Sequence, residues 1–155
     1  MQTDRNIMRK QEMLLVELGE VIREALLDDD IVEIMRNPDG HLWTEGHSSG
    51  MVDLGPFSKE KAMSIINIVA DAAETVVTRE KPVISAEMPH RGERFEGLIP
   101  PVVAEPTFTI RKKAVKIFDL ESYVSNEIMT PFQAETIVDA VTHRKNIVIV
   151  GSLNY

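Results

Sequence analysis

The chain of 155 residues contains no cysteine. This excludes disulfide bonds, thiolate nucleophiles and cysteine-based zinc sites, and it favours an intracellular protein. No apolar run approaches the length of a membrane-spanning helix, and residues 1–5 do not lead into the apolar core of a signal peptide. Internal repeats and low-complexity segments are also missing, so the composition is that of an ordinary folded domain.

Positive charge is also scarce. The 17 Lys and Arg residues stand against 25 Asp and Glu residues, which gives a formal net charge of −8 at pH 7. Because duplex recognition depends on a basic face, this balance argues against nucleic acid as the main partner. We therefore expect no direct nucleic-acid binding.

The acidic residues and the histidines do not form a recognisable metal site. The adjacent carboxylates Asp28, Asp29 and Asp30 follow a predicted helix, and no glycine-centred calcium loop comes after them. Their side chains diverge, which is typical of a solvated turn. The histidines at positions 41, 47, 90 and 143 lack the spacing of metal ligands. The sequence therefore predicts no bound metal in this chain.

Apolar periodicity predicts an α+β fold. The predicted elements are a helix at 4–27, strands at 31–35, 41–45 and 51–54, a helix at 58–77, and strands at 83–88, 94–99 and 107–111. The core-facing stripes are Leu15, Leu18, Ile22, Ala25 and Leu26, widened by Leu14 and Val21, in the first helix, and Ala62, Ile65, Ile66, Val69, Ala73 and Val76 in the second. This order of elements is typical of an antiparallel sheet with its helices packed on one face.

The two strands around the proline-rich connection each carry one arginine. Side chains alternate between the faces of a sheet, so Phe108 and Ile110 can enter the core while Arg111 stands on the other face with the threonines. Arg94 alternates with Phe95 in the same way. A guanidinium can form bidentate hydrogen bonds with carboxylate or phosphate oxygens, so these arginines are candidates for anion binding. The alternative is a solvated sheet face without a ligand.

The last part of the chain has a different pattern. A short helical turn is predicted at 119–124 and a helix at 131–143, whose start has Thr130 as N-cap, Pro131 at the first position and Gln133 closing a capping box. The run at 147–150 is continuously apolar and is followed by Gly151, as in a buried parallel strand that leads into a phosphate-binding loop.

Several phrases in one order resemble the VirB-type hexameric traffic ATPases of secretion and conjugation systems. They are EALLD at 24–28, VEIM at 32–35, NPDG at 37–40, TREKP at 78–82, RFEGLIPPVV at 94–103, TFTIRK at 107–112 and NIVIVG at 146–151. The likeness covers residues 20–151, and a series of long phrases is more specific than a single short motif.

This resemblance implies a PAS-like N-terminal α+β domain of a traffic ATPase, followed by the first helix and strand of a P-loop α/β domain. The implied divisions are a ring-forming domain at 1–115, a linker at 116–130 and the start of the ATPase domain at 131–155. It also implies a homo-oligomer, a hexameric ring in the whole protein. Its partners would be components of a membrane secretion or conjugation complex. The expected location is the cytoplasm, at the periphery of the bacterial inner membrane.

The resemblance also assigns a role to the two arginines. In the family, the N-terminal domain lends arginines to the phosphates of a nucleotide held mainly by the C-terminal domain, and Arg94 and Arg111 match those positions by their surrounding phrases. Met129 and Thr130, ahead of the capped helix, are expected near the base. The whole family member would use ATP and magnesium, and no tightly bound cofactor is expected in this chain.

The chain itself lacks the chemistry of a P-loop. After Gly151 it continues with Ser152 and ends at Tyr155, without the lysine and the Ser or Thr that hold the phosphates and magnesium. We therefore expect a truncated or frameshifted N-terminal piece of a traffic ATPase, whose residues 152–155 are foreign or remnant and which does not hydrolyse ATP. Two other functions remain open: a nucleotide-independent module that docks on a secretion complex, and a small-molecule sensor.

Overall fold

The structure, a computed structural model, describes residues 2–89, 91–113 and 119–151. The tail at 152–155 that we expect to be foreign lies outside these residues. By its internal contacts the chain divides into two compact units, Met1–Val115 and Lys116–Tyr155, and each is described by itself.

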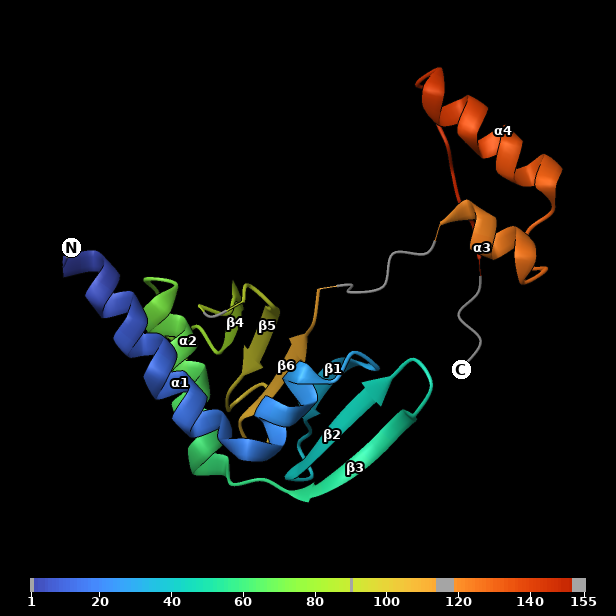
Figure 1. The fold of residues 1–155 in the computed structure, drawn as a ribbon. Helices are drawn as coiled ribbons and strands as arrows, with labels where there is room; N and C mark the ends of the chain where they lie inside the picture. The colour runs from blue at the N-terminus through green and yellow to red at the C-terminus, as the bar shows by residue number, and fades with distance from the viewer. Residues whose placement is uncertain (1, 90, 114–118, 152–155) are drawn as a thin grey trace. The chain divides into compact units, whose positions relative to one another are not determined.

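The first unit is an α+β domain, as predicted (Figure 1). Its elements are α1 (Gln2–Leu27), β1 (Ile31–Arg36), β2 (His41–Gly46), β3 (Gly50–Pro56), α2 (Lys59–Ala72), β4 (Val83–Glu87), β5 (Arg94–Leu98) and β6 (Thr107–Arg111). The strands form one sheet in the order β3-β2-β1-β6-β5-β4, and every neighbouring pair is antiparallel. The sheet thus consists of two three-stranded meanders that join along β1 and β6.

Both helices cover one face of this sheet. Helix α1 packs on α2 and β1, and α2 packs on β4, β5 and β6. The row Ile34, Ile110 and Phe95 runs across β1, β6 and β5 beneath them, and all three side chains are buried. Among the described residues of this unit, no helix covers the opposite face, which therefore carries the polar positions of the central strands.

The first predicted stripe is correct at most positions. Leu18, Ile22, Ala25 and Leu26 are buried together with Leu14. Val21, however, is exposed and Leu15 is only half-buried, contrary to prediction. Gly19, whose φ of 71° lies in the left-handed region, interrupts the helix between these two residues. The buried residues on its two sides nevertheless keep a spacing of four, at 14, 18, 22 and 26.

Helix α2 ends earlier than its apolar pattern predicts. Ser58 caps its start as expected, but the helix stops at Ala72, which leaves Val76 exposed. The end is a Schellman motif in which the Thr75 N–H donates to the Ala70 carbonyl and the Glu74 N–H donates to the Asp71 carbonyl. Glu74 takes the positive φ that glycine usually supplies.

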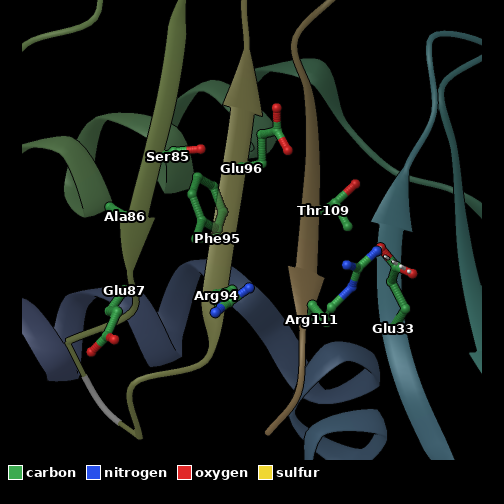
Figure 2. Close-up of a pocket in the computed structure, with 9 residues that line it drawn as sticks. All are labelled: Glu33, Ser85, Ala86, Glu87, Arg94, Phe95, Glu96, Thr109 and Arg111. Atoms are coloured by element: carbon green, nitrogen blue, oxygen red, sulfur yellow. Dashed lines mark hydrogen bonds and ion pairs between the residues drawn. The ribbon is translucent and has the colours of Figure 1, made fainter. Parts of the chain in front are cut away.

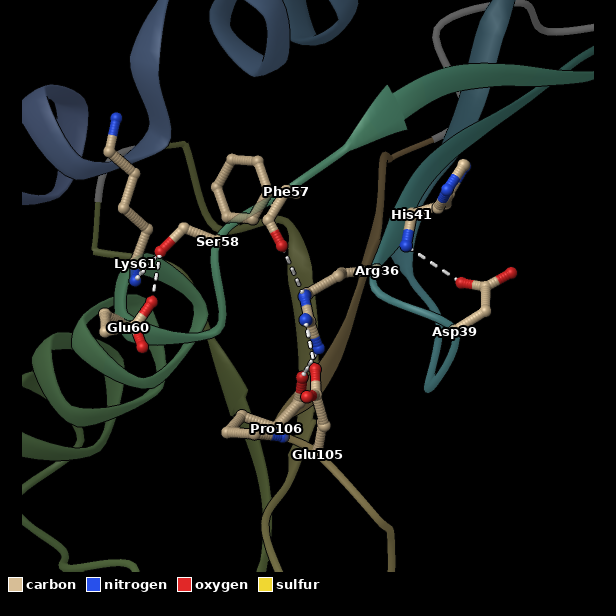
Figure 3. A network of polar contacts seen from close by, with 9 residues as sticks. All are labelled: Arg36, Asp39, His41, Phe57, Ser58, Glu60, Lys61, Glu105 and Pro106. Atoms are coloured by element: carbon tan, nitrogen blue, oxygen red, sulfur yellow. Dashed lines mark hydrogen bonds and ion pairs between the residues drawn. The ribbon is translucent and has the colours of Figure 1, made fainter.

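A buried arginine joins three separate segments of the domain (Figure 3). Arg36, the last residue of β1, is 2% exposed. Its Nε donates to the Phe57 carbonyl at 3.1 Å, and its Nη2 donates to Glu105 Oε2 at 2.8 Å. Its Nη1 donates to the Pro106 carbonyl. The guanidinium therefore ties the end of β1 to the entry of α2 and to the segment that leads into β6.

The carboxylate of Asp30 organises the turn between β2 and β3. It accepts hydrogen bonds from the backbone N–H groups of Ser48 and Ser49, at 2.8 and 3.0 Å. The hydrogen bond from the Ser49 hydroxyl, followed by that from the Ser48 N–H, lowers the pKa of Asp30 to about 2. The acidic run after α1 thus includes a residue with a defined structural role.

The second unit holds two helices, α3 (Leu120–Ser125) and α4 (Pro131–Thr142). The capping box at the start of α4 is present as predicted. The predicted strand at 147–150 is wrong for this structure, since these residues form no strand and their side chains are 44% to 89% exposed. A buried strand needs neighbours on both sides, and the described part of this unit contains no other strand. Across the described residues, no helix is long and apolar enough to cross a membrane.

We predict that Arg36→Leu lowers the free energy of unfolding by about 2–4 kcal/mol, because it removes a buried charge-assisted cluster and leaves two carbonyls and Glu105 without their donor. Urea unfolding measures this loss. The matched control is Arg79→Leu, an exposed arginine, for which a change within about 0.5 kcal/mol is expected. Equal stability of the two variants would contradict the role of Arg36.

We also predict that Asp30 makes stability depend on pH. Because its folded pKa is depressed, its contribution is complete above the unfolded value of about 4 and disappears as the pH falls towards 2. The difference in melting temperature between the wild type and Asp30→Asn should shrink over this interval. Asp29→Asn is the control, since Asp29 donates and accepts none of the turn's bonds. A difference that stays constant with pH would rule the role out.

Candidate functional site

A row of charged side chains crosses the uncovered face of the sheet (Figure 2). In the strand register Glu33 of β1 lies opposite Arg111 of β6, Arg111 lies opposite Arg94 of β5, and Arg94 lies opposite Glu87 of β4. Four neighbouring strands therefore contribute one charged residue each to the same row. This confirms that Arg94 and Arg111 share a sheet face, as the alternation predicts.

Buried aromatic and aliphatic residues fix the strands that carry the two arginines. Phe95 and Ile110, the neighbours of Arg94 and Arg111 in sequence, are 2% and 0% exposed and are paired across β5 and β6. The rings of Phe95 and Phe108 stack with centroids 6.0 Å apart. The arginines thus stand on a rigid base, and their freedom is limited to the side chains.

The two guanidinium groups differ in their surroundings. Arg111 Nη2 donates to both oxygens of Glu33, at 3.2 and 3.4 Å. Arg94 forms no hydrogen bond or ion pair with any residue that the structure describes. Like charges in directly opposed positions destabilise a sheet. Glu33 offsets this cost for Arg111, whereas the donors of Arg94 face solvent.

The arginines border a shallow hollow of about 540 Å³. Its lining residues are Glu33, Ser85, Ala86, Glu87, Arg94, Phe95, Glu96, Thr109 and Arg111. Three carboxylates against two guanidinium groups give this lining a net charge of −1. The two arginines can bind an oxyanion in this hollow, but the surrounding carboxylates repel the oxyanion. A ligand bound here would need further contacts from outside this unit.

The residue after Arg111 has a structural role. Lys112 Nζ donates to the carbonyls of Ala25 and Asp28, at the C-terminal end of α1. A cation is favourable there because the last carbonyls of a helix carry partial negative charge. Burial lowers the pKa of Lys112. Its charge therefore serves α1 and not the row of Arg94 and Arg111.

Met129 and Thr130, expected near a nucleotide base, belong to the second unit. Thr130 uses its backbone N–H and its hydroxyl in the capping box with Gln133. The N–H of Met129 donates to the Tyr123 carbonyl. Their local bonds thus explain both residues as parts of the α3–α4 connection, and a contact with a base stays a prediction.

The carboxylates of the hollow were not predicted from the sequence. Glu87 and Glu96 come from the consecutive strands β4 and β5, whereas Glu33 comes from β1, far away in the chain. Alternation assigns each of them to a face, but only the pairing of β1 with β6 brings Glu33 next to Arg111. No group of three or more potential metal-ligating side chains occurs among the described residues.

Comparison with known proteins agrees with this architecture. No protein-family model matches the chain. The probable conjugal transfer protein TrbB of Sinorhizobium fredii is 46% identical over 134 residues, and the conjugal transfer protein TrbB of Rhizobium radiobacter is 44% identical over the same number. Over this region the chain is homologous to the TrbB conjugal transfer proteins. The match covers 86% of this chain but only 41% and 42% of those TrbB proteins, so the chain spans about two-fifths of their length.

A solved structure has the same fold. The crystal structure of the VirB11 ATPase from the Brucella suis type IV secretion system, in complex with sulphate, matches with a TM-score of 0.66 and 24% sequence identity. The match covers 85% of this chain and 44% of the VirB11 chain. The open antiparallel sheet with helices on one face is therefore the fold of part of a type IV secretion ATPase. The chain thus shares sequence homology with conjugal transfer proteins and a fold with VirB11.

Proposed function

We propose that this chain is the N-terminal part of a TrbB-type ATPase that powers conjugative transfer, and that its open sheet face completes a nucleotide site. The observation that carries the proposal is the pair of adjacent arginines on the uncovered sheet face, one of which has no partner among the described residues. The TrbB homology provides the setting in which such a pair has a use.

In this proposal Arg94 and Arg111 bind phosphate oxygens. Guanidinium groups present parallel N–H donors that match the oxygens of a phosphoryl group, and they stabilise the charge that develops as the terminal phosphate is transferred. The free donors of Arg94 and the exposure of Arg111 fit this role. The negative lining implies that the nucleotide is held mainly elsewhere, by the remaining three-fifths of the longer protein, which would also bind magnesium.

The assembly and the location are part of the same proposal. A ring of six copies would bring the sheet face of each first unit to a nucleotide, with the ring attached to components of a membrane secretion complex at the cytoplasmic side. The strands β3 and β4 form the two edges of the sheet, and neither has a second partner strand among the described residues. Such edges are available for contacts between subunits.

A nucleotide-independent docking module is the second candidate. The specific observation in its favour is the carboxylate excess in the hollow, which suits a basic segment of a partner better than a phosphate. The two candidates differ in the effect of removing an arginine, because a docking module needs no transition-state charge stabilisation.

We predict that this 155-residue chain releases no phosphate from ATP above background, because residues 1–155 contain no P-loop lysine and no Ser or Thr ligand for magnesium. A coupled phosphate-release assay with magnesium measures this. A full-length TrbB relative assayed in parallel is the positive control. Magnesium-dependent turnover that stays with the chain through several purification steps would contradict the prediction.

We predict that Arg94→Ala or Arg111→Ala, placed at the matching positions of a full-length TrbB protein, lowers turnover about a hundredfold, the effect of about 3 kcal/mol of lost transition-state stabilisation. Nucleotide affinity should change much less. Steady-state kinetics and equilibrium binding of ATP separate the two quantities.

The control for these variants is Arg79→Ala, which removes an exposed arginine outside the hollow. It should leave both turnover and affinity unchanged. Normal turnover in both Arg94→Ala and Arg111→Ala, with folding verified by circular dichroism, would reject the phosphate role and leave the docking module as the better candidate.

A further inference from the structure

The ion pair between Glu33 and Arg111 has features that a surface salt bridge does not need. The Glu33 side chain is only 17% exposed, whereas that of Arg111 is 64% exposed. Arg111 therefore remains accessible while its counter-ion is held inside the sheet face. One nitrogen, Nη2, contacts both carboxylate oxygens, so the other guanidinium donors of Arg111 stay available.

The strand register explains why Glu33 points to Arg111. On one side Glu33 lies opposite Glu45 of β2, and on the other side it lies opposite Arg111 of β6. Opposed carboxylates repel and opposed unlike charges attract. Both forces move the Glu33 carboxylate towards β6. The pair is therefore set by the backbone of three strands and does not depend on the chance rotamer of two long side chains.

We infer that Glu33 is the internal counter-ion of Arg111, and that a phosphate must displace it before both arginines can bind the same oxyanion. The inference rests on the proposed phosphate role of Arg94 and Arg111. Glu33 is then a positioning residue: it holds the Arg111 guanidinium in place when no anion is present and lowers the affinity of the arginine pair for phosphate.

The charge balance of the hollow also indicates that Glu33 lowers the affinity for phosphate. With Glu33 ionised, the lining has three carboxylates and two guanidinium groups, and neutralising Glu33 makes the two signs equal. Arg94 has no counter-ion among the described residues, so an approaching anion meets Arg94 first. Recruitment of Arg111 then requires the exchange of one oxyanion, the carboxylate, for another, the phosphate. This exchange makes a weak site selective for ligands that carry several negative charges.

Binding of tripolyphosphate to this 155-residue chain tests the inference. Isothermal titration at low salt should give an affinity about three- to tenfold higher for Glu33→Gln than for the wild type. The substitution removes one negative charge within about 5 Å of the bound anion, and it also removes the carboxylate that competes with the anion for Arg111. The matched control is Glu45→Gln, which removes the same charge from the neighbouring position on the same face. It should change the affinity less than about twofold, since Glu45 forms no hydrogen bond or ion pair with Arg111.

A gain in affinity separates positioning from a purely structural role, because a damaged fold does not bind more tightly. The gain should vanish when Glu33→Gln is combined with Arg111→Ala, and the Nε–H resonance of Arg111 should shift in Glu33→Gln before any anion is added. Equal affinities of Glu33→Gln and the wild type, including undetectable binding by both, would overturn the inference. So would an equal gain in Glu45→Gln.

The experiment also distinguishes this inference from the proposed function. If Arg94→Ala and Arg111→Ala weaken tripolyphosphate binding while Glu33→Gln leaves it unchanged, the phosphate role stands and the role of Glu33 is rejected. If neither arginine variant changes the affinity, the phosphate role itself fails on this chain, and the inference fails with it.

Discussion

The buried guanidinium of Arg36 is the contact on which the arrangement of the sheet depends. It binds carbonyl groups from the entry of α2 and from the segment before β6, and a carboxylate from the same segment. Arg36 also pairs with Phe108 in the register between β1 and β6. The same register places Glu33 opposite Arg111 three residues away. The polar cluster of Arg36 and the ion pair of Glu33 thus lie on opposite faces of β1 and share one strand register.

The fold could be predicted from local patterns wherever those patterns decide the structure. Alternation in β5 and β6 separates Phe95 and Ile110 from the arginines, and the capping residues before α4 mark its start. The end of α2 could not be predicted as well. Helices α2, α3 and α4 are each followed by a non-glycine residue with positive φ, at Glu74, Glu127 and Arg144, so the usual glycine signal is missing. Local backbone hydrogen bonds close these ends, such as the one from the Thr75 N–H to the Ala70 carbonyl.

The candidate site, like the fold, could be predicted from the sequence only in part. That Arg94 and Arg111 share a face follows from a period of two. The counter-ion of Arg111, however, follows from the pairing of β1 with β6, which lie far apart in the chain. Glu33 has no distinguishing sequence motif, and its role depends on Arg111 being its partner across the strands. The charge of the hollow likewise emerges only after the sheet is assembled. Sequence alternation therefore finds the cations of a sheet face more readily than it finds the carboxylates that control them.

The sheet is two meanders joined by the single pairing of β1 with β6, and the Glu33–Arg111 ion pair lies on that seam. A shift of this pairing by two residues would keep every side chain on its own face. It would nevertheless give Arg111 a different cross-strand neighbour. The register of β1 and β6 therefore determines which side chain faces this arginine. An evolutionary change in the core beneath the seam could thereby retune the anion affinity of the face without altering any residue that touches the anion.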